Sequence, residues 1–108
     1  MKVKLKMLKK VDILGCTYRV IWEKSHNGGS FSWGKSEIRI GIEAMHKDPL
    51  YTFSILSHEI MEATYAMMGA RFDNGRISED YLFNFNHQVF ENAIQIHTQA
   101  ISQFIDWK

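Results

Sequence analysis

Hydrophobic and polar residues alternate over three stretches within the first 45 positions of the chain. These stretches are residues 2–11, 15–24 and 36–44. In each stretch, every second residue is apolar and would lie on one face of a strand. These residues are Val3, Leu5 and Met7 in the first stretch, Tyr18, Val20 and Trp22 in the second, and Ile38, Ile40 and Ile42 in the third. A period of two is typical of a strand with one buried face, so the pattern predicts about three strands. The intervening segment SHNGGSFSWGKS, rich in Gly and Ser, indicates a loop or an irregular hairpin.

A helical period replaces the alternation after residue 47. Pro49 suits a first helical turn and Asp48 can cap it, whereas Gly69 is typical of the position just after a helix. These signals predict a helix over residues 50–68. Its apolar stripe consists of Phe53, Leu56, Ile60, Ala63, Thr64 and Met67, which we expect to pack on the sheet.

A second helix is predicted over residues 86–104. Its inward-facing residues are expected to be Phe90, Ala93, Ile94, Ile101 and Phe104. Residues 71–81 between the two helices read as a loop, with Asn74-Gly75 as the strongest turn signal. The expected fold class is therefore α+β: a single domain over residues 1–108, with a small antiparallel or mixed sheet of about three strands followed by two long helices.

Composition narrows the function only slightly. The formal net charge of +1 over 108 residues gives no sign of nucleic-acid binding, and the lysines near the N-terminus fit the solvated face of a strand. No run approaches the ~20 apolar residues that a membrane span needs, and no signal-peptide pattern is present. The lone Cys16 fits a reducing compartment and a small buried residue. We therefore expect a soluble, cytoplasmic protein that binds neither nucleic acid nor membrane.

The stretch SILSHEIMEA, residues 54–63, carries the candidate chemistry. His58 and Glu62 are four residues apart, so on a helix they project to the same side and can grip one ion. Glu59 is expected to point elsewhere around the helix. In the related HExxH pattern of metalloproteases, the acid at this position is a general base acting on metal-activated water. The bland alternative is an exposed helix face that happens to carry a histidine and two acids.

His87 and Glu91, at the start of the second predicted helix, extend the candidate site. If this helix packs antiparallel beside the first, His87 can join His58 and Glu62. Two imidazoles and one carboxylate form the ligand set of many catalytic zinc sites and leave a fourth position open. Glu91, one turn further along, can replace or join His87. The same set can also hold Fe(II).

Four segments resemble the small zincin-like metallopeptidases of bacteriophages and their bacterial hosts. They are ILGCTYRVIW, GKSEIRIGIE, ILSHEIMEA and NHQVFENA, and together they span about residues 10–105. The resemblance implies a zinc ion held by His58, Glu62 and His87, with Glu59 as the catalytic base. Glu62 departs from the family's second histidine and His87 from its usual acid, so the two exchanges compensate each other.

Two functions follow as expectations. The first is a zinc-dependent, phage-type metallopeptidase that hydrolyses peptide bonds of a peptide or protein substrate, in the bacterial cytoplasm if phage-encoded. The alternative is a non-catalytic zincin-like binding or regulatory module with a structural metal or none, for which Glu91 would be a fourth ligand. Gly28 and Gly29 are candidates to border a substrate cleft. His26 and His46 are expected at the surface, and His97 packed or facing solvent.

Overall fold

The computed structural model describes residues 3–45, 47–73, 81–83 and 86–107. Along the chain its elements are β1 (Val3–Leu5), β2 (Lys10–Ile13), β3 (Cys16–Glu23), β4 (Gly29–Ser32), β5 (Glu37–Gly41), α1 (Pro49–Met67), β6 (Arg71–Asp73), β7 (Tyr81–Phe83), α2 (His87–Ser102) and β8 (Ile105–Trp107). The fold is α+β, with a four-stranded mixed sheet and two helices. Short strand pairs β1–β8 and β6–β7 complete it.

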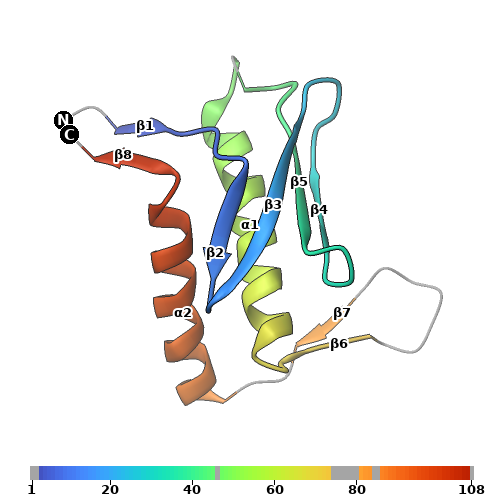
Figure 1. The fold of residues 1–108 in the computed structure, drawn as a ribbon, viewed down its shortest axis with the longest axis vertical. Helices are drawn as coiled ribbons and strands as arrows, with labels where there is room; N and C mark the ends of the chain where they lie inside the picture. The colour runs from blue at the N-terminus through green and yellow to red at the C-terminus, as the bar shows by residue number, and fades with distance from the viewer. Residues whose placement is uncertain (1–2, 46, 74–80, 84–85, 108) are drawn as a thin grey trace.

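The main sheet has the strand order β2-β3-β5-β4, with β3 and β5 parallel and the other neighbours antiparallel. It contains four strands where three were predicted, because β4 forms inside the Gly- and Ser-rich segment that read as a loop or irregular hairpin. The first predicted strand, over residues 2–11, is instead two strands. Of these, β2 joins the main sheet, whereas β1 pairs with β8 at the other end of the chain (Figure 1).

The two helices lie side by side against one face of the sheet and run in opposite directions (Figure 1). The predicted apolar faces of the strands point into this layer. The core between sheet and helices comprises Val11, Ile13, Tyr18, Val20, Ile38, Ile40, Leu56, Ile60, Ala63, Ala100, Ile101 and Phe104. Burial of this apolar surface is the main force that fixes α1 on the sheet.

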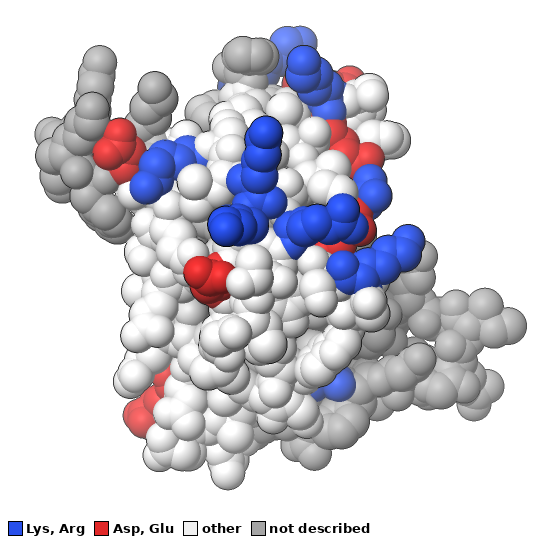
Figure 2. Space-filling view, in the orientation of Figure 1, with Lys and Arg blue, Asp and Glu red and all other residues white. Residues whose placement is uncertain are grey.

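Lys and Arg side chains gather on the face of the molecule that Figure 2 presents, with acidic groups among them. On the sheet, Arg39 and Arg19 both pair with the buried Glu37: Arg39 Nη2 lies 2.6 Å from Oε1, and Arg19 Nη2 lies 3.2 Å from Oε2. Lys6, Lys9 and Lys10 are exposed, as expected for a solvated strand face. Because acids pair with these arginines, the face is one of mixed charge.

The predicted ends of α1 are confirmed. The Asp48 carboxylate accepts a hydrogen bond from the Tyr51 backbone N–H at 3.1 Å, and Pro49 is the first helical residue. After Met67, Gly69 adopts a φ of +72°, a left-handed conformation that favours glycine. These local signals set the helix register, and with it the directions of the candidate ligands.

The predicted inward face of α2 is correct at Ala93 and Ile101 but wrong at Phe90 and Ile94, which are 43% and 41% exposed. Phe104 is buried as predicted, but it lies just beyond α2, which ends at Ser102 and not at residue 104. The two small residues Ala93 and Ala100 are buried instead of a continuous row of large ones. Ile94 follows Ala93 directly and is therefore turned by about 100° away from it around the helix. Phe90 and Ile94 consequently lie beside the buried stripe and not within it.

Two further expectations have different outcomes. Cys16 is exposed at the start of β3, so the prediction of a small buried residue is wrong. Among the residues that the structure describes, no helix is both long enough and apolar enough to cross a membrane.

Candidate metal centre

The middle of α1 brings three ligand-type side chains together. One donor atom from each of His58, Glu59 and Glu62 lies within 4.8 Å of the other two. Within this cluster, His58 Nε2 lies 2.7 Å from Glu62 Oε2, as expected for residues four apart on a helix. His58 keeps 66% of its side chain exposed, whereas Glu62 keeps 20%. His58 is therefore the solvent-exposed member of the pair, and Glu62 is the more buried one.

Glu59 differs from its prediction. It was expected to point away from His58 and Glu62, yet its carboxylate belongs to their cluster and it is only 5% exposed. The reason is its position three residues after Leu56 and four before Ala63, which puts it on the helix face that packs on the sheet. A lone acid on an otherwise apolar stripe was the sequence signal for this burial.

The environment of Glu59 favours its neutral form. Burial first and the nearby negative charge of Glu62 second raise the pKa of Glu59 to about 7, against smaller lowering effects of His58 and Arg71. A carboxyl group with a pKa near neutrality can both accept and return a proton at physiological pH. Such shifts are common at functional sites and also occur in structural ion-pair clusters.

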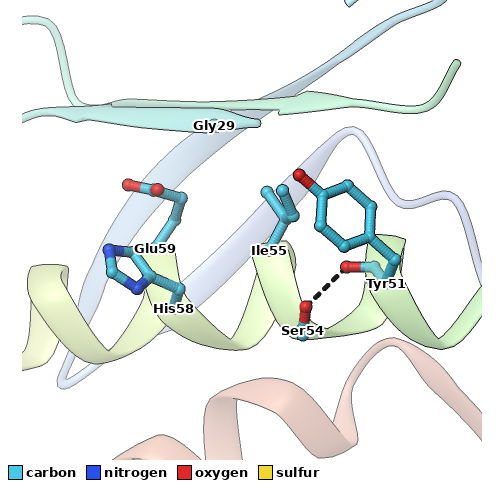
Figure 3. Close-up of a pocket in the computed structure, with 6 residues that line it drawn as sticks. All are labelled: Gly29, Tyr51, Ser54, Ile55, His58 and Glu59. Atoms are coloured by element: carbon cyan, nitrogen blue, oxygen red, sulfur yellow. Dashed lines mark hydrogen bonds between the residues drawn. The ribbon is translucent and has the colours of Figure 1, made fainter. Parts of the chain in front are cut away.

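Gly29 of β4 lies directly against Glu59. A Cβ atom on Gly29 would come within 2.9 Å of Glu59 Cγ and 2.8 Å of Ile55 Cγ2. Real side chains do not pack at such distances, so the missing side chain of glycine permits the close approach of β4 to α1. Figure 3 shows the Glu59 carboxylate in the space between α1 and the strand that carries Gly29.

Two adjoining hollows of about 320 Å³ each open along this seam between α1 and β4. We call them together the β4 cleft. The first is lined by Gly29, Tyr51, Ser54, Ile55, His58 and Glu59 (Figure 3), and the second by Gly29, Ser30, Phe31, His58, Glu59, Glu62 and Arg71. His58, Glu59 and Glu62 all line this cleft, so a molecule bound in it can contact the three side chains. Gly29 therefore borders a cleft, as predicted, whereas Gly28 lines neither hollow, and the binding of a substrate there stays a prediction.

Arg71 was not foreseen from the sequence. It begins β6 just after the turn that ends α1, and its Nε lies 3.5 Å from Glu62 Oε1. Its guanidinium also lies 5.3 Å from the centre of the Phe31 ring, a cation–π distance. Arg71 thus links the ligand-bearing helix to β4 and adds positive charge beside Glu62. No motif marks it, because only the tertiary fold brings β6 to this place.

His87 and Glu91 do not join the cluster that the structure forms. They contact each other, with His87 Nδ1 3.5 Å from Glu91 Oε1, and both side chains are exposed. Further along α2, His97 Nε2 lies 2.9 Å from Ser57 Oγ on α1. His87 is three helical turns before His97, roughly 15 Å at 1.5 Å per residue. The antiparallel helices are present, but this register puts His87 toward the C-terminal end of α1, away from His58 in the middle of that helix.

The predictions for the remaining histidines can be compared with the structure one by one. His97 is half-buried between the helices, and this burial lowers its pKa. Of the two positions expected for His97, packed or facing solvent, the structure shows the packed one. His26 is exposed at the surface, as predicted, 3.9 Å from Glu23. His46 lies outside the described residues.

The donor set fits a divalent cation. Zinc binds imidazole nitrogen and carboxylate oxygen at about 2.0–2.2 Å with tetrahedral geometry, which puts its donors roughly 3.3 Å apart. The three donors lie within 4.8 Å of one another, and His58 Nε2 and Glu62 Oε2 are 2.7 Å apart. The spacing of the donors is therefore compatible with a bound ion. One imidazole with carboxylates suits zinc, iron or manganese better than a soft cation.

Comparison of the chain with protein-family models, with curated proteins and with solved structures found no match. The resemblance to zincin-like metallopeptidases therefore stays a prediction from the sequence.

Proposed function

We propose that the protein is a zinc-dependent hydrolase of the metallopeptidase type. The observation that carries the proposal is the convergence of three donors at the mouth of the β4 cleft, one of them the buried Glu59. An exposed helix face with a histidine and two acids would leave all three side chains in water. Burial of an acid is costly unless a partner or a function compensates for it.

In the proposed mechanism, His58 and Glu62 would hold the ion, whereas Glu59 of the same cluster would stay free to act as the base. Arg71 orients Glu62 through the contact of its Nε with Glu62 Oε1. When bound, zinc would supply Lewis-acid chemistry, polarising a carbonyl and acidifying a water molecule. Glu59 accepts the proton of the attacking water on its carboxylate and returns it to the leaving amine. Its burial and its place beside His58 and Glu62 suit a group that makes both transfers.

The substrate in this proposal is an extended peptide. Strand β4 is an edge of the main sheet, paired with β5 on one side and with no further strand among the described residues. An extended peptide can add to such an edge through main-chain hydrogen bonds. Because Gly29 of β4 packs on Glu59, a peptide bound along this edge would have a backbone carbonyl near His58 and Glu62.

The experiment that tests the proposal compares zinc-loaded wild type with the Glu59→Gln variant on a mixture of unstructured peptides. Wild type is expected to hydrolyse peptides. The variant should keep its zinc and lose roughly 10²–10⁴-fold in rate, the usual contribution of a general base. Hydrolysis retained in Glu59→Gln would remove Glu59 from the mechanism. Zinc binding without hydrolysis of any peptide by wild type would favour the non-catalytic module.

A further inference from the structure

A separate cavity of about 550 Å³ lies along α1, next to the candidate metal centre. We call it the apolar cavity. It is lined by Ser54, Ser57, His58, Met61, Glu62 and Tyr65 of α1 and by Phe83 of β7, and no residue of β4 contributes. His58 and Glu62 border both this cavity and the β4 cleft. The candidate ligands therefore stand between the two spaces.

The walls of the apolar cavity are mainly hydrophobic. Tyr65 and Phe83 meet edge to face, with ring centres 5.6 Å apart and planes inclined at 67°, and Met61 is half-buried beside them. Phe83 nevertheless keeps 43% of its surface exposed. Aromatic and methionine side chains around an open space are typical of sites that bind apolar groups.

The two serines of the apolar cavity already have hydrogen-bond partners within the protein. Ser57 Oγ lies 2.9 Å from His97 Nε2, and Ser54 Oγ donates to the Tyr51 carbonyl at 2.6 Å. Because these bonds occupy both hydroxyl groups, an apolar occupant would not leave them unpaired. His58 and Glu62, at the edge of the cavity, are the candidate metal ligands.

We infer that the apolar cavity binds a large apolar side chain of the substrate, on the residue next to the scissile bond. This inference rests on the proposed function. A peptide with its reacting carbonyl at His58 and Glu62 has the neighbouring side chain within reach of the space that the same two residues border. The volume suffices, because a cavity of about 150 Å³ already holds a benzene ring. The substrate class is thus peptides with Phe, Leu or a similar residue at the cleavage site.

The test uses the zinc-loaded full chain and quenched fluorescent peptides that differ at one position only, with Phe, Leu, Ala or Asp. Cleavage sites are located by mass spectrometry. We expect kcat/KM for Phe and Leu to exceed that for Ala and Asp by at least ~10-fold, the scale on which apolar pockets discriminate. Phe83→Ala should reduce this preference. Phe90→Ala is the matched control, because Phe90 is also 43% exposed but lies on α2 outside the cavity.

A second variant, Met61→Trp, fills the cavity and should shift the preference from Phe toward Ala. In parallel, N-acetyl-phenylalanine amide is added while the NMR signal of the Met61 methyl group is followed. Hydrolysis with no apolar preference, or equal effects of Phe83→Ala and Phe90→Ala, would overturn the inference and leave the proposed function standing. A shifted Met61 signal without hydrolysis of any peptide would support the binding of apolar groups in the cavity and overturn the proposed peptidase function. Neither hydrolysis nor a shift would overturn both.

Discussion

Gly29 on β4 and Glu59 on α1 lie so close that a methyl group on Gly29 would stand 2.9 Å from Glu59 Cγ. The edge strand and the buried acid are therefore positioned by one contact. The same contact narrows the β4 cleft where His58 and Glu62 face it. A change at Gly29 should thus act on the site without altering any candidate ligand.

Gly29→Ala is expected to lower hydrolysis and thermal stability together, because either β4 or the Glu59 side chain must move to admit the methyl group. The neighbouring atoms include the Arg39 carbonyl at 2.9 Å, which cannot rotate away as a side chain can. We expect a destabilisation of about 1–3 kcal/mol, the usual cost of overpacking. Thermal unfolding followed by circular dichroism measures it.

The matched control is Gly34→Ala, because a Cβ at Gly34 would meet no atom within 4 Å and the residue has no positive φ. This variant should unfold within about 0.5 kcal/mol of wild type, as surface substitutions usually do. Equal stability and activity of the Gly29 and Gly34 variants would contradict the role given to Gly29.

Glu62 and His87 can be distinguished by zinc affinity. Glu62→Gln removes a charged donor from the cluster on α1 and should weaken zinc binding at least ~10-fold. His87→Ala should leave the affinity unchanged, because His87 pairs with Glu91 three turns away from the level of His97 and Ser57. Isothermal titration with zinc measures both. An equal loss in the two variants would mean that the start of α2 moves to the metal centre, as the sequence predicted.

The metal-free protein should lose stability as the pH rises through the pKa of Glu59. The folded chain holds this proton with a pKa of about 7, whereas the reference value of the carboxyl group is 4.5. Folding is therefore disfavoured progressively between about pH 4.5 and pH 7, by an amount on the order of 2–3 kcal/mol. Glu59→Gln removes this loss. Urea unfolding in the presence of chelator measures the free energy of unfolding at pH 5 and pH 8. Relative to wild type, the variant should be more stable at pH 8 than it is at pH 5.

The exposed Glu91 supplies the control for this pH dependence. Glu91→Gln should follow the wild-type stability at both pH values. If the Glu59 and Glu91 variants had the same pH profile, the burial of Glu59 would have no energetic consequence.

Protonation of His97 should lower the stability of the folded protein at acidic pH, whereas ionisation of Glu59 lowers it at higher pH. Burial lowers its pKa below the reference value of 6.5, so the folded chain binds this proton less tightly than the unfolded chain. The stability present above pH 6.5 is therefore lost as the pH falls. His97→Gln cannot be protonated and should flatten the decline between pH 7 and pH 5. The exposed His26→Gln is the comparison, and the same flattening there would contradict the assignment to His97.

Local chemistry explains what the sequence predicted well. Asp48, Pro49 and Gly69 define the ends of α1 within the chain segment itself, and the helical period then sets His58 and Glu62 on one side. The alternation in β3 and β5 likewise marks their buried faces. These features depend on neighbours a few residues apart, so the sequence alone carries them.

Long-range packing explains what the sequence missed. The short strand β4 has little apolar periodicity and exists because it pairs with β5 and packs on α1. Arg71 reaches Glu62 only through the path of β6, and the position of His87 depends on the register between two helices. Glu59 was predicted to point away from His58 and Glu62. Leu56 and Ala63 were assigned to the buried stripe of the helix, but Glu59, which lies between them on the same face, was left out of it.

Zinc stoichiometry tests the central claim most directly. Purified protein is stripped with chelator, titrated with zinc and freed of unbound metal, and the metal per chain is measured by mass spectrometry, with His58→Ala as the comparison. We expect one zinc ion per wild-type chain at saturation and a loss of at least ~10-fold in affinity in the variant. Absence of stoichiometric zinc in wild type, or equal binding by both proteins, would contradict it.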